Sequence, residues 1–151
     1  MEEFWAVYSH LIRPSKMAIA TDYHLFKEGI TPLWEDAKNK EGGKWMIRIK
    51  KQCTNRLWET LMLCVIGEQF GVCGESINGI VVSLRYQEDI LALWNASPDR
   101  GVRDGLHSAL RKQLKLPNQT SVEEKFHKEN FRVNGEMRDE ILVYDLCLTK
   151  F

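Results

Sequence analysis

Hydrophobic and polar residues alternate along several segments of the chain. Between Lys44 and Lys51, the apolar residues Trp45, Ile47 and Ile49 alternate with mostly basic ones, which predicts a strand with one buried face and one solvated face. Similar alternation or high β propensity predicts five further strands. They lie around Tyr23–Phe26, Ile80–Leu84, Ile90–Asn95, Val122–Phe126 and Ile141–Leu148.

Apolar residues spaced three or four positions apart predict three helices. The clearest runs over Thr54–Phe70, and the others cover Glu2–Ile12 and Val102–Leu116, each followed closely by a proline. Residues 29–43 combine proline, asparagine and paired glycines, so they are expected to form a long loop. Strands joined by short turns, together with three helices, indicate an α+β fold in which helices cover one face of a sheet.

The Thr54–Phe70 helix carries a second apolar stripe, formed by Leu63, Ile66 and Phe70. A helix that is apolar on two sides is either sandwiched within the protein or offers one side to a partner. Trp5 lies at the edge of the apolar stripe of the first helix. For Leu63 and Trp5 together the pattern favours a partner surface, which would receive an amphipathic helix.

The chain has 151 residues, with 21 basic and 21 acidic ones. This is the length of a single domain. A net charge of zero excludes binding through a broad basic surface, so any contact with nucleic acid must be local. The five tryptophans call for an explanation, because ordinary usage gives roughly two in such a chain.

Two neighbours in the predicted loop, Trp34 and Glu35, suit the recognition of a planar cationic base. An indole offers a π face for stacking, and a carboxylate can accept two N–H bonds from a guanine-like edge. The alternative is that Trp34 folds back onto the core and fixes its loop. Trp94 stands between the same two interpretations, whereas Trp45 and Trp58 are expected in the core.

Arg85 and Lys44 are expected to leave the core on strand backbones, opposite the apolar residues of their strands. A guanidinium held on a rigid strand can grip a phosphate with two hydrogen bonds, and a lysine can add a point charge. The alternative is that both cations are ordinary solvated residues.

Catalytic and metal-binding motifs are missing from the sequence. There is no Gly-x-Ser-x-Gly, P-loop or His-Glu-x-x-His pattern, and the four cysteines show no Cys-x-x-Cys spacing. We therefore expect no enzyme activity, no metal and no cofactor.

The longest apolar run, Leu61–Gly67, is about a third of the length that a membrane span needs. A cytoplasmic protein with reduced thiols and no membrane contact is expected.

Several short segments follow one another in a fixed order between about Glu2 and His127. They are Glu3-Phe4-Trp5, Leu25-Phe26-Lys27-Glu28-Gly29-Ile30, Pro32-Leu33-Trp34-Glu35-Asp36, Gly42-Gly43-Lys44-Trp45, Ile66-Gly67-Glu68-Gln69-Phe70, Val82-Ser83-Leu84-Arg85-Tyr86-Gln87-Glu88-Asp89 and Trp94-Asn95. In this order they resemble the cap-binding translation initiation factor 4E family. The run Gln87-Glu88-Asp89-Ile90 and the pair Trp58-Glu59 are most similar to its 4E-homologous, often repressive, class.

The resemblance implies a curved antiparallel sheet with three helices packed on its convex face, in one domain over residues 1–151. It also implies that the chain begins after the family's first strands, which leaves a new sheet edge, and that residues 128–151 form a tail outside the family pattern. One of the two aromatic residues that sandwich the base in this family would then be missing. Ile90 and Gln87 stand where the initiation factor itself has basic residues.

Roles for single residues follow from the resemblance. Trp34 would stack on 7-methylguanine, Glu35 would bind the edge of the guanine, and Trp94 would lie against the methyl group. Arg85 and Lys44 would contact the phosphates of the mRNA cap.

A second surface is also implied by the resemblance. Trp5, Leu63 and Glu59 would receive partner proteins that carry a Tyr-x-x-x-x-Leu-hydrophobic helix. The leading hypothesis is a monomer that binds the 7-methylguanosine cap of mRNA and regulates or represses translation initiation by recognition alone. The alternative is a shortened form that does not bind the cap but sequesters helical partners.

Overall fold

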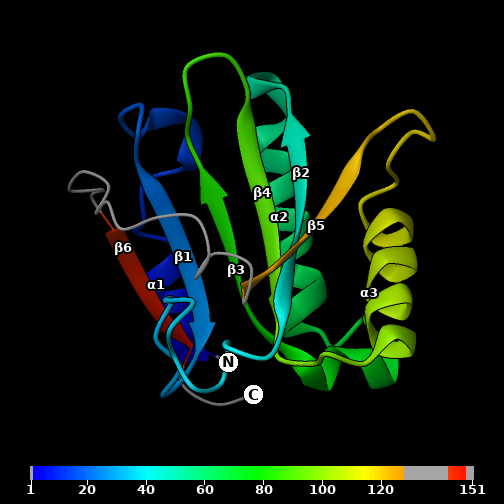
Figure 1. The fold of residues 1–151 in the computed structure, drawn as a ribbon. Helices are drawn as coiled ribbons and strands as arrows, with labels where there is room; N and C mark the ends of the chain where they lie inside the picture. Colours follow the sequence, from blue (N-terminus) through cyan, green and yellow to red (C-terminus); the bar gives the residue numbers. More distant parts are fainter. Residues whose placement is uncertain (1, 128–142, 149–151) are drawn as a thin grey trace.

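The computed structural model describes residues 2–127 and 143–148, so part of the predicted tail lies outside the described residues. A six-stranded sheet with strand order β5-β2-β4-β3-β1-β6 is its main layer (Figure 1). The strands are β1 (Asp22–Lys27), β2 (Gly43–Ile49), β3 (Ile77–Ser83), β4 (Asp89–Asn95), β5 (Val122–Phe126) and β6 (Val143–Leu148). These match the six predicted strands to within about three residues at each end.

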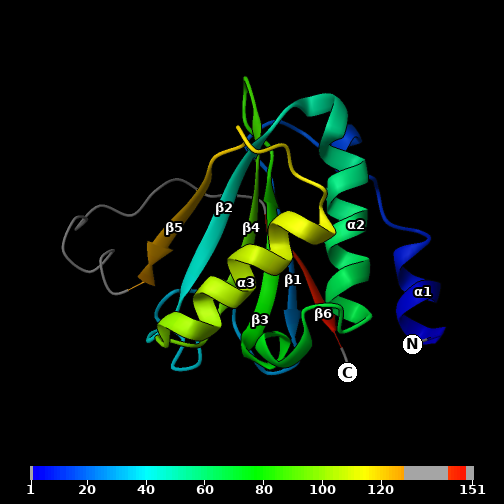
Figure 2. The same cartoon turned by 90° about the vertical axis from the view of Figure 1, so that its right-hand side faces the viewer.

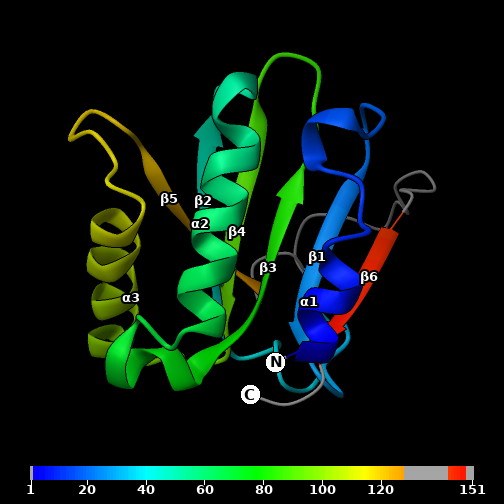
Figure 3. The same ribbon diagram turned by 180° about the vertical axis from the view of Figure 1, so that it is seen from behind.

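Three helices lie on one side of this sheet, as Figures 2 and 3 show. They are α1 (Glu2–Tyr8), α2 (Thr54–Ile66) and α3 (Arg100–Gln113). The predicted α+β class with helices on one face is confirmed. Of the three predicted helices, α2 and α3 are the two main ones, with 13 and 14 residues, whereas α1 is short, with 7.

The sheet departs from the antiparallel prediction at one edge. Five strands pair antiparallel, but β6 runs parallel to β1, with Asp22 opposite Val143 and Lys27 opposite Leu148. The sequence analysis expected a new sheet edge without naming its strand, and in the structure β6 covers the outer edge of β1. Parallel neighbours need a long connection, and the chain between β1 and β6 provides it, since it includes the strands β2 to β5 and the helices α2 and α3.

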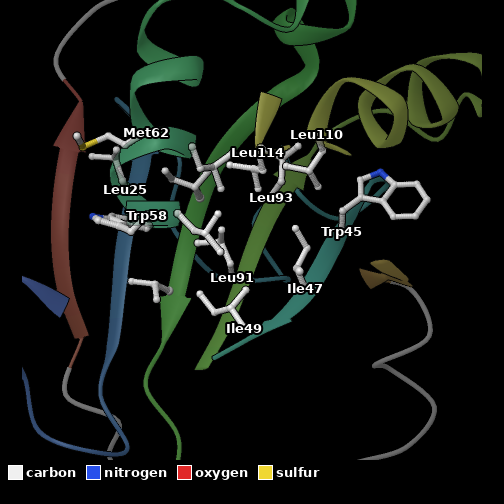
Figure 4. Close-up of a cluster of buried hydrophobic side chains, with 14 of the residues drawn as sticks. Leu25, Trp45, Ile47, Ile49, Trp58, Met62, Leu91, Leu93, Leu110 and Leu114 are labelled. Atoms are coloured by element: carbon white, nitrogen blue, oxygen red, sulfur yellow. The ribbon is translucent and has the colours of Figure 1, made fainter. Parts of the chain in front are cut away.

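The side chains of the strands alternate between two environments. Trp45, Ile47 and Ile49 of β2 are at most 8% exposed and face the helices, as predicted. Trp58 of α2 is fully buried in the same cluster, with its ring 5.5 Å from that of Tyr23, which confirms its place in the core. Figure 4 shows this cluster between the sheet and α2. Its labelled members are Leu25, Trp45, Ile47, Ile49, Trp58, Met62, Leu91, Leu93, Leu110 and Leu114.

Helix α2 ends at Ile66, four residues earlier than predicted. The backbone N–H of Gly67 closes the last turn on the Leu63 carbonyl at 2.8 Å, and a Cβ at Gly67 would lie only 2.9 Å from that oxygen. Ile66 and Phe70 are each 5% exposed, whereas Leu63 is 49% exposed. The second apolar stripe is thus mostly buried, and only Leu63 remains at the surface.

Asp89, at the start of β4, ties three elements together. Its carboxylate is 2% exposed and accepts hydrogen bonds from Thr54 Oγ1 at 2.6 Å, Lys51 Nζ at 2.8 Å and the Arg85 backbone N–H at 3.2 Å. A buried carboxylate needs such donors to offset its desolvation. Asp89 therefore fixes the beginning of α2 against the β3–β4 turn.

Gly42, directly before β2, lies against the backbone of the neighbouring strand. A Cβ at this position would stand 1.8 Å from the Asn95 carbonyl oxygen, and neither backbone can move away without breaking the β2–β4 ladder. We expect Gly42→Ala to lower the free energy of unfolding by about 3 kcal/mol, measured by chemical denaturation.

Gly101→Ala in α3 is the matched control. Its added Cβ would meet only the tip of the Asp99 side chain, at 3.2 Å, and alanine favours the helix by about 1 kcal/mol. Equal stability of the two variants would contradict the role assigned to Gly42.

Candidate functional site

The sheet face without helices carries a second, smaller apolar cluster. Its buried members are Phe26, Val81, Ala92 and Trp94, and Ile30, Trp34 and Met46 pack against them. Because side chains alternate along a strand, Ala92 and Trp94 point away from the helices while Leu91 and Leu93 point toward them. Two tryptophans predicted to read a base therefore belong to one cluster on the helix-free face.

The loop that carries Trp34 is held closed by Asp36. Its carboxylate accepts backbone N–H bonds from Lys38 at 2.8 Å and Thr31 at 2.9 Å. These bonds, with that of Lys38 the largest contribution, lower the pKa of the Asp36 carboxyl below its ordinary value. Asp36 is thus a structural acid of the loop, not a base reader.

Asn39 and Asn78 fasten the same loop to the sheet. The fully buried Asn39 side chain donates to the carbonyls of Leu33 at 2.8 Å and Thr31 at 2.9 Å. Asn78, at the start of β3, donates to Asn39 Oδ1 and to the Lys38 carbonyl, both at 2.8 Å. Trp34 therefore sits on a rigid loop, half-buried on the second cluster, and the neighbouring Glu35 is exposed.

Trp94 is enclosed on several sides and is only 7% exposed. Phe26 meets its ring edge-on at 5.4 Å between centroids, and the His127 ring lies 4.3 Å away at 33°. The Lys44 ammonium stands 5.1 Å from the centroid of the Trp94 ring. A ligand on this face therefore meets a small part of Trp94, whereas Trp34 presents more of its indole.

Lys44 and His127 share a partly dehydrated environment. Burial, and then the positive charge of Lys125, lower the pKa of Lys44. Burial, and then the charge of Lys44, lower the pKa of His127 to about 4, although the Gly43 backbone lies close enough to oppose part of this shift. At neutral pH the imidazole is uncharged, so the positive charge over Trp94 belongs to Lys44.

The sequence analysis expected Arg85 on a strand, and this expectation is wrong, because β3 ends at Ser83. It lies in the β3–β4 turn, and its Nη1 is 2.7 Å from Asp22 Oδ1. Asp22 pairs with Ser83 and hence lies opposite Ile90, roughly 13 Å along the sheet from the row of Trp94. The structure thus brings Lys44 to Trp94 but places Arg85 near the far end of the same face.

The residues predicted for a partner surface lie on the other side of the molecule. Trp5 of α1 is 37% exposed and Leu63 of α2 is 49% exposed. Glu59, one turn before Leu63, is half-exposed and lines a pocket of about 100 Å³ with Tyr8 and Tyr23. The residues predicted to bind the cap and those predicted to bind a partner are therefore on opposite sides of the sheet, with the main core between them.

Phe26, His127 and Lys125 were missed as members of the site. The position of Phe26 could have been predicted from the sequence. Tyr23 and Leu25 point to one face of the predicted strand, so Phe26 must point to the other, away from the helices. The position of His127 could not have been predicted, since it depends on a backbone hydrogen bond to Gly42 in a distant segment.

Among the residues that the structure describes, no His, Cys, Asp and Glu side chains gather into a metal-binding group, and no helix could cross a membrane.

Comparison with known proteins gives sequence relatives over nearly the whole chain. The profile of a family described as Eukaryotic initiation factor 4E matches residues 1–141, which extends past His127. A wheat (Triticum aestivum) protein, eukaryotic translation initiation factor NCBP, is 45% identical over 92% of this chain and 60% of its own length. Initiation factor 4E-4 of Caenorhabditis elegans is 43% identical over 91% of the chain and 65% of its own length. The chain thus spans about three-fifths of the length of these curated relatives.

Solved structures share the fold. Caenorhabditis elegans eIF4E-3, in complex with the 4E-binding protein Mextli and a cap analog, superposes with a TM-score of 0.83 at 31% identity, covering 90% of this chain and 79% of that one. Ascaris suum eIF4E-3 in complex with the m7G cap gives a TM-score of 0.80 at 33% identity, covering 92% and 77%.

Acid is expected to destabilise the protein through His127. Its pKa is 6.5 in an unfolded chain and about 4 in the folded protein, so between these values the unfolded state binds more protons. This contribution to stability is complete above pH 6.5, falls by on the order of 3 kcal/mol as the pH drops toward 4, and then levels off. Urea unfolding between pH 7.5 and 4 measures it. In His127→Gln the free energy of unfolding should lack this loss between pH 6.5 and 4. If the free energies of the two proteins change with pH in parallel, His127 is not the group responsible.

Proposed function

The chain belongs to the eukaryotic initiation factor 4E family, and on this premise we propose that it binds the 7-methylguanosine cap of mRNA on the helix-free face of its sheet. The family comprises non-catalytic translation factors, in agreement with the lack of a catalytic motif. We further propose that the chain regulates or represses translation initiation, as expected of the 4E-homologous class.

The observation that carries the proposal is the meeting of Trp34 and Trp94 in one apolar cluster with Lys44 beside it. Methylation at N7 makes guanine cationic, and a cationic base stacks well on an indole. Trp34 is the stacking platform because more of its ring is exposed. Glu35, next to it on the clamped loop, accepts the N–H groups of the guanine edge, and the rim of Trp94 contacts the methyl group.

The phosphates of the cap are assigned to Lys44 and Arg85. Arg85 already bonds to Asp22, but its side chain is 38% exposed, and a guanidinium has five N–H donors. Phosphates that extend from a base at Trp34 along the sheet face can therefore reach free donors of Arg85. Its contribution is reduced by the competing carboxylate.

The exposed side chains Trp5 and Leu63 support a second role, the binding of a partner helix. A relative with the same fold, eIF4E-3 of Caenorhabditis elegans, was solved in complex with the 4E-binding protein Mextli. We assign Trp5 and Leu63 to the apolar side of a Tyr-x-x-x-x-Leu-hydrophobic helix, and Glu59 to its polar edge. This surface also serves the alternative function, a protein that sequesters partners without binding the cap.

Quenching of tryptophan fluorescence by 7-methyl-GTP tests cap binding. Wild-type protein should be quenched with saturation, and Trp34→Ala should weaken binding by roughly 5- to 150-fold, because it removes the stacking platform. Trp5→Ala, on the opposite side of the sheet, should bind as the wild type does. Absence of quenching at millimolar ligand would reject cap binding by this chain.

Capture by an immobilised peptide with the Tyr-x-x-x-x-Leu-hydrophobic motif tests the partner surface. Trp5→Ala should reduce capture at least about 30-fold, the size of an aromatic hot spot in a helix interface. Trp34→Ala should leave capture unchanged. Loss of capture in Trp34→Ala with retention in Trp5→Ala would exclude the proposed surface.

A further inference from the structure

Two lysines stand directly opposite each other on β2 and β5. The register of these antiparallel strands pairs Lys44 with Lys125. Both lie on the helix-free face, because Trp45 of the same strand points into the main core. Like charges at directly opposite positions of an antiparallel pair are destabilising. The sheet therefore holds an unfavourable like-charge pair on β2 and β5, and β2 is the neighbour of β4 (Figure 1), on which Trp94 pairs with Lys44.

The described residues around these lysines offer no compensating ion pair. Glu123, the nearest acid on the same face of β5, lies 3.8 Å from Arg48 instead. Asp22 attracts Lys44 only from a distance, and its own contact at 2.7 Å is with Arg85. Within the part of the chain that the structure describes, neither lysine has a carboxylate within 4 Å.

The buried side chain of His127 adjoins the same place. The His127 ring is fully buried, and neither Nδ1 nor Nε2 has a hydrogen bond of ordinary geometry to a described residue. The ring packs on Trp94, over which Lys44 extends. A neutral imidazole always carries one N–H, so this corner combines two cations with a buried donor that makes no hydrogen bond of ordinary geometry to a described residue. Unpaired buried donors are rare and often mark the place of a bound group.

We propose that Lys44 and Lys125 together form a site for a phosphate group at the β2–β5 edge, beside Trp94. The inference rests on the proposed function, because it takes the phosphates of a cap nucleotide as the anion. It adds Lys125, which neither the motifs of the chain nor its resemblance single out.

A phosphate suits this site better than a single carboxylate does. Its oxygens can accept bonds from both ammonium groups at once, and two successive phosphates of a cap nucleotide, with a charge of about −1 each, cancel the two positive charges. Binding then removes the repulsion between the lysines in addition to forming new bonds.

Lys125→Gln separates this role from a structural one. Affinity for 7-methyl-GTP should fall about three- to tenfold, while affinity for the uncharged-tail ligand 7-methylguanosine should stay unchanged or become slightly tighter. The thermal unfolding midpoint of the free protein should stay the same or rise, because a like-charge contact is removed. Lys112→Gln, which removes an exposed lysine on α3, is the matched control and should change neither affinity.

The outcomes distinguish this inference from the proposed function. If wild-type protein binds 7-methyl-GTP and Lys125→Gln binds it equally well, the two-lysine site is rejected and cap binding stands. If wild-type protein does not bind 7-methyl-GTP, cap binding is rejected, and inorganic tripolyphosphate becomes the probe. A rise of the unfolding midpoint with tripolyphosphate that is lost in Lys125→Gln would then still support the site, and no rise in wild-type protein would overturn it.

Discussion

The close backbone packing at Gly42 and Gly43 is the constraint on which the helix-free face depends. Any Cβ at these positions would lie 1.8 Å from the Asn95 carbonyl oxygen or 2.6 Å from that of Lys125. Because both are glycines, β2 can be flanked by β4 and β5 at the same point. The Asn95 side chain then donates to the Gly43 carbonyl at 3.1 Å, and the His127 N–H to the Gly42 carbonyl at 3.2 Å. The indole, ammonium and imidazole groups of the candidate site are brought together by this contact.

Arg85 and Lys44, which were both predicted to bind phosphate, lie in opposite electrostatic surroundings. Arg85 is exposed enough to meet a ligand but already has the carboxylate of Asp22 at 2.7 Å. Lys44 is more dehydrated, has no such partner among the described residues and faces Lys125. An anion at Arg85 must compete with an existing ion pair, whereas an anion at Lys44 relieves a repulsion. The electrostatic gain from a phosphate is therefore larger near Trp94, although zero net charge gives no hint of this asymmetry.

Local sequence patterns could predict most of the elements but not how distant segments meet. Alternation identified β2 and its buried row, and helical spacing identified α2, because these signals depend on neighbours in the chain. Arg85 was misplaced because its backbone N–H bonds to the Asp89 carboxylate, which the remote donors of Lys51 and Thr54 also bind. The parallel pairing of β6 depends on a crossover, which no local signal encodes. In the candidate site, Trp34 could be identified from the sequence, because an indole beside a carboxylate in a predicted loop suits base recognition. The surroundings of His127 and Lys125 arise only when distant strands pair, so the sequence could not predict them.

Base and phosphate recognition must depend on each other if the ligand is a 7-methylguanosine nucleotide. The Lys44 ammonium stands 5.1 Å from the centre of the Trp94 ring and so takes up part of its attraction for cations. A positively charged base that approaches this indole meets a like charge, and two unit charges 5 Å apart near a protein surface repel by about 3 kcal/mol. A phosphate on Lys44 cancels that repulsion and attracts the base as well. The face is therefore suited to a ligand that carries its cation and its anions together, and neither part alone should gain the full binding energy.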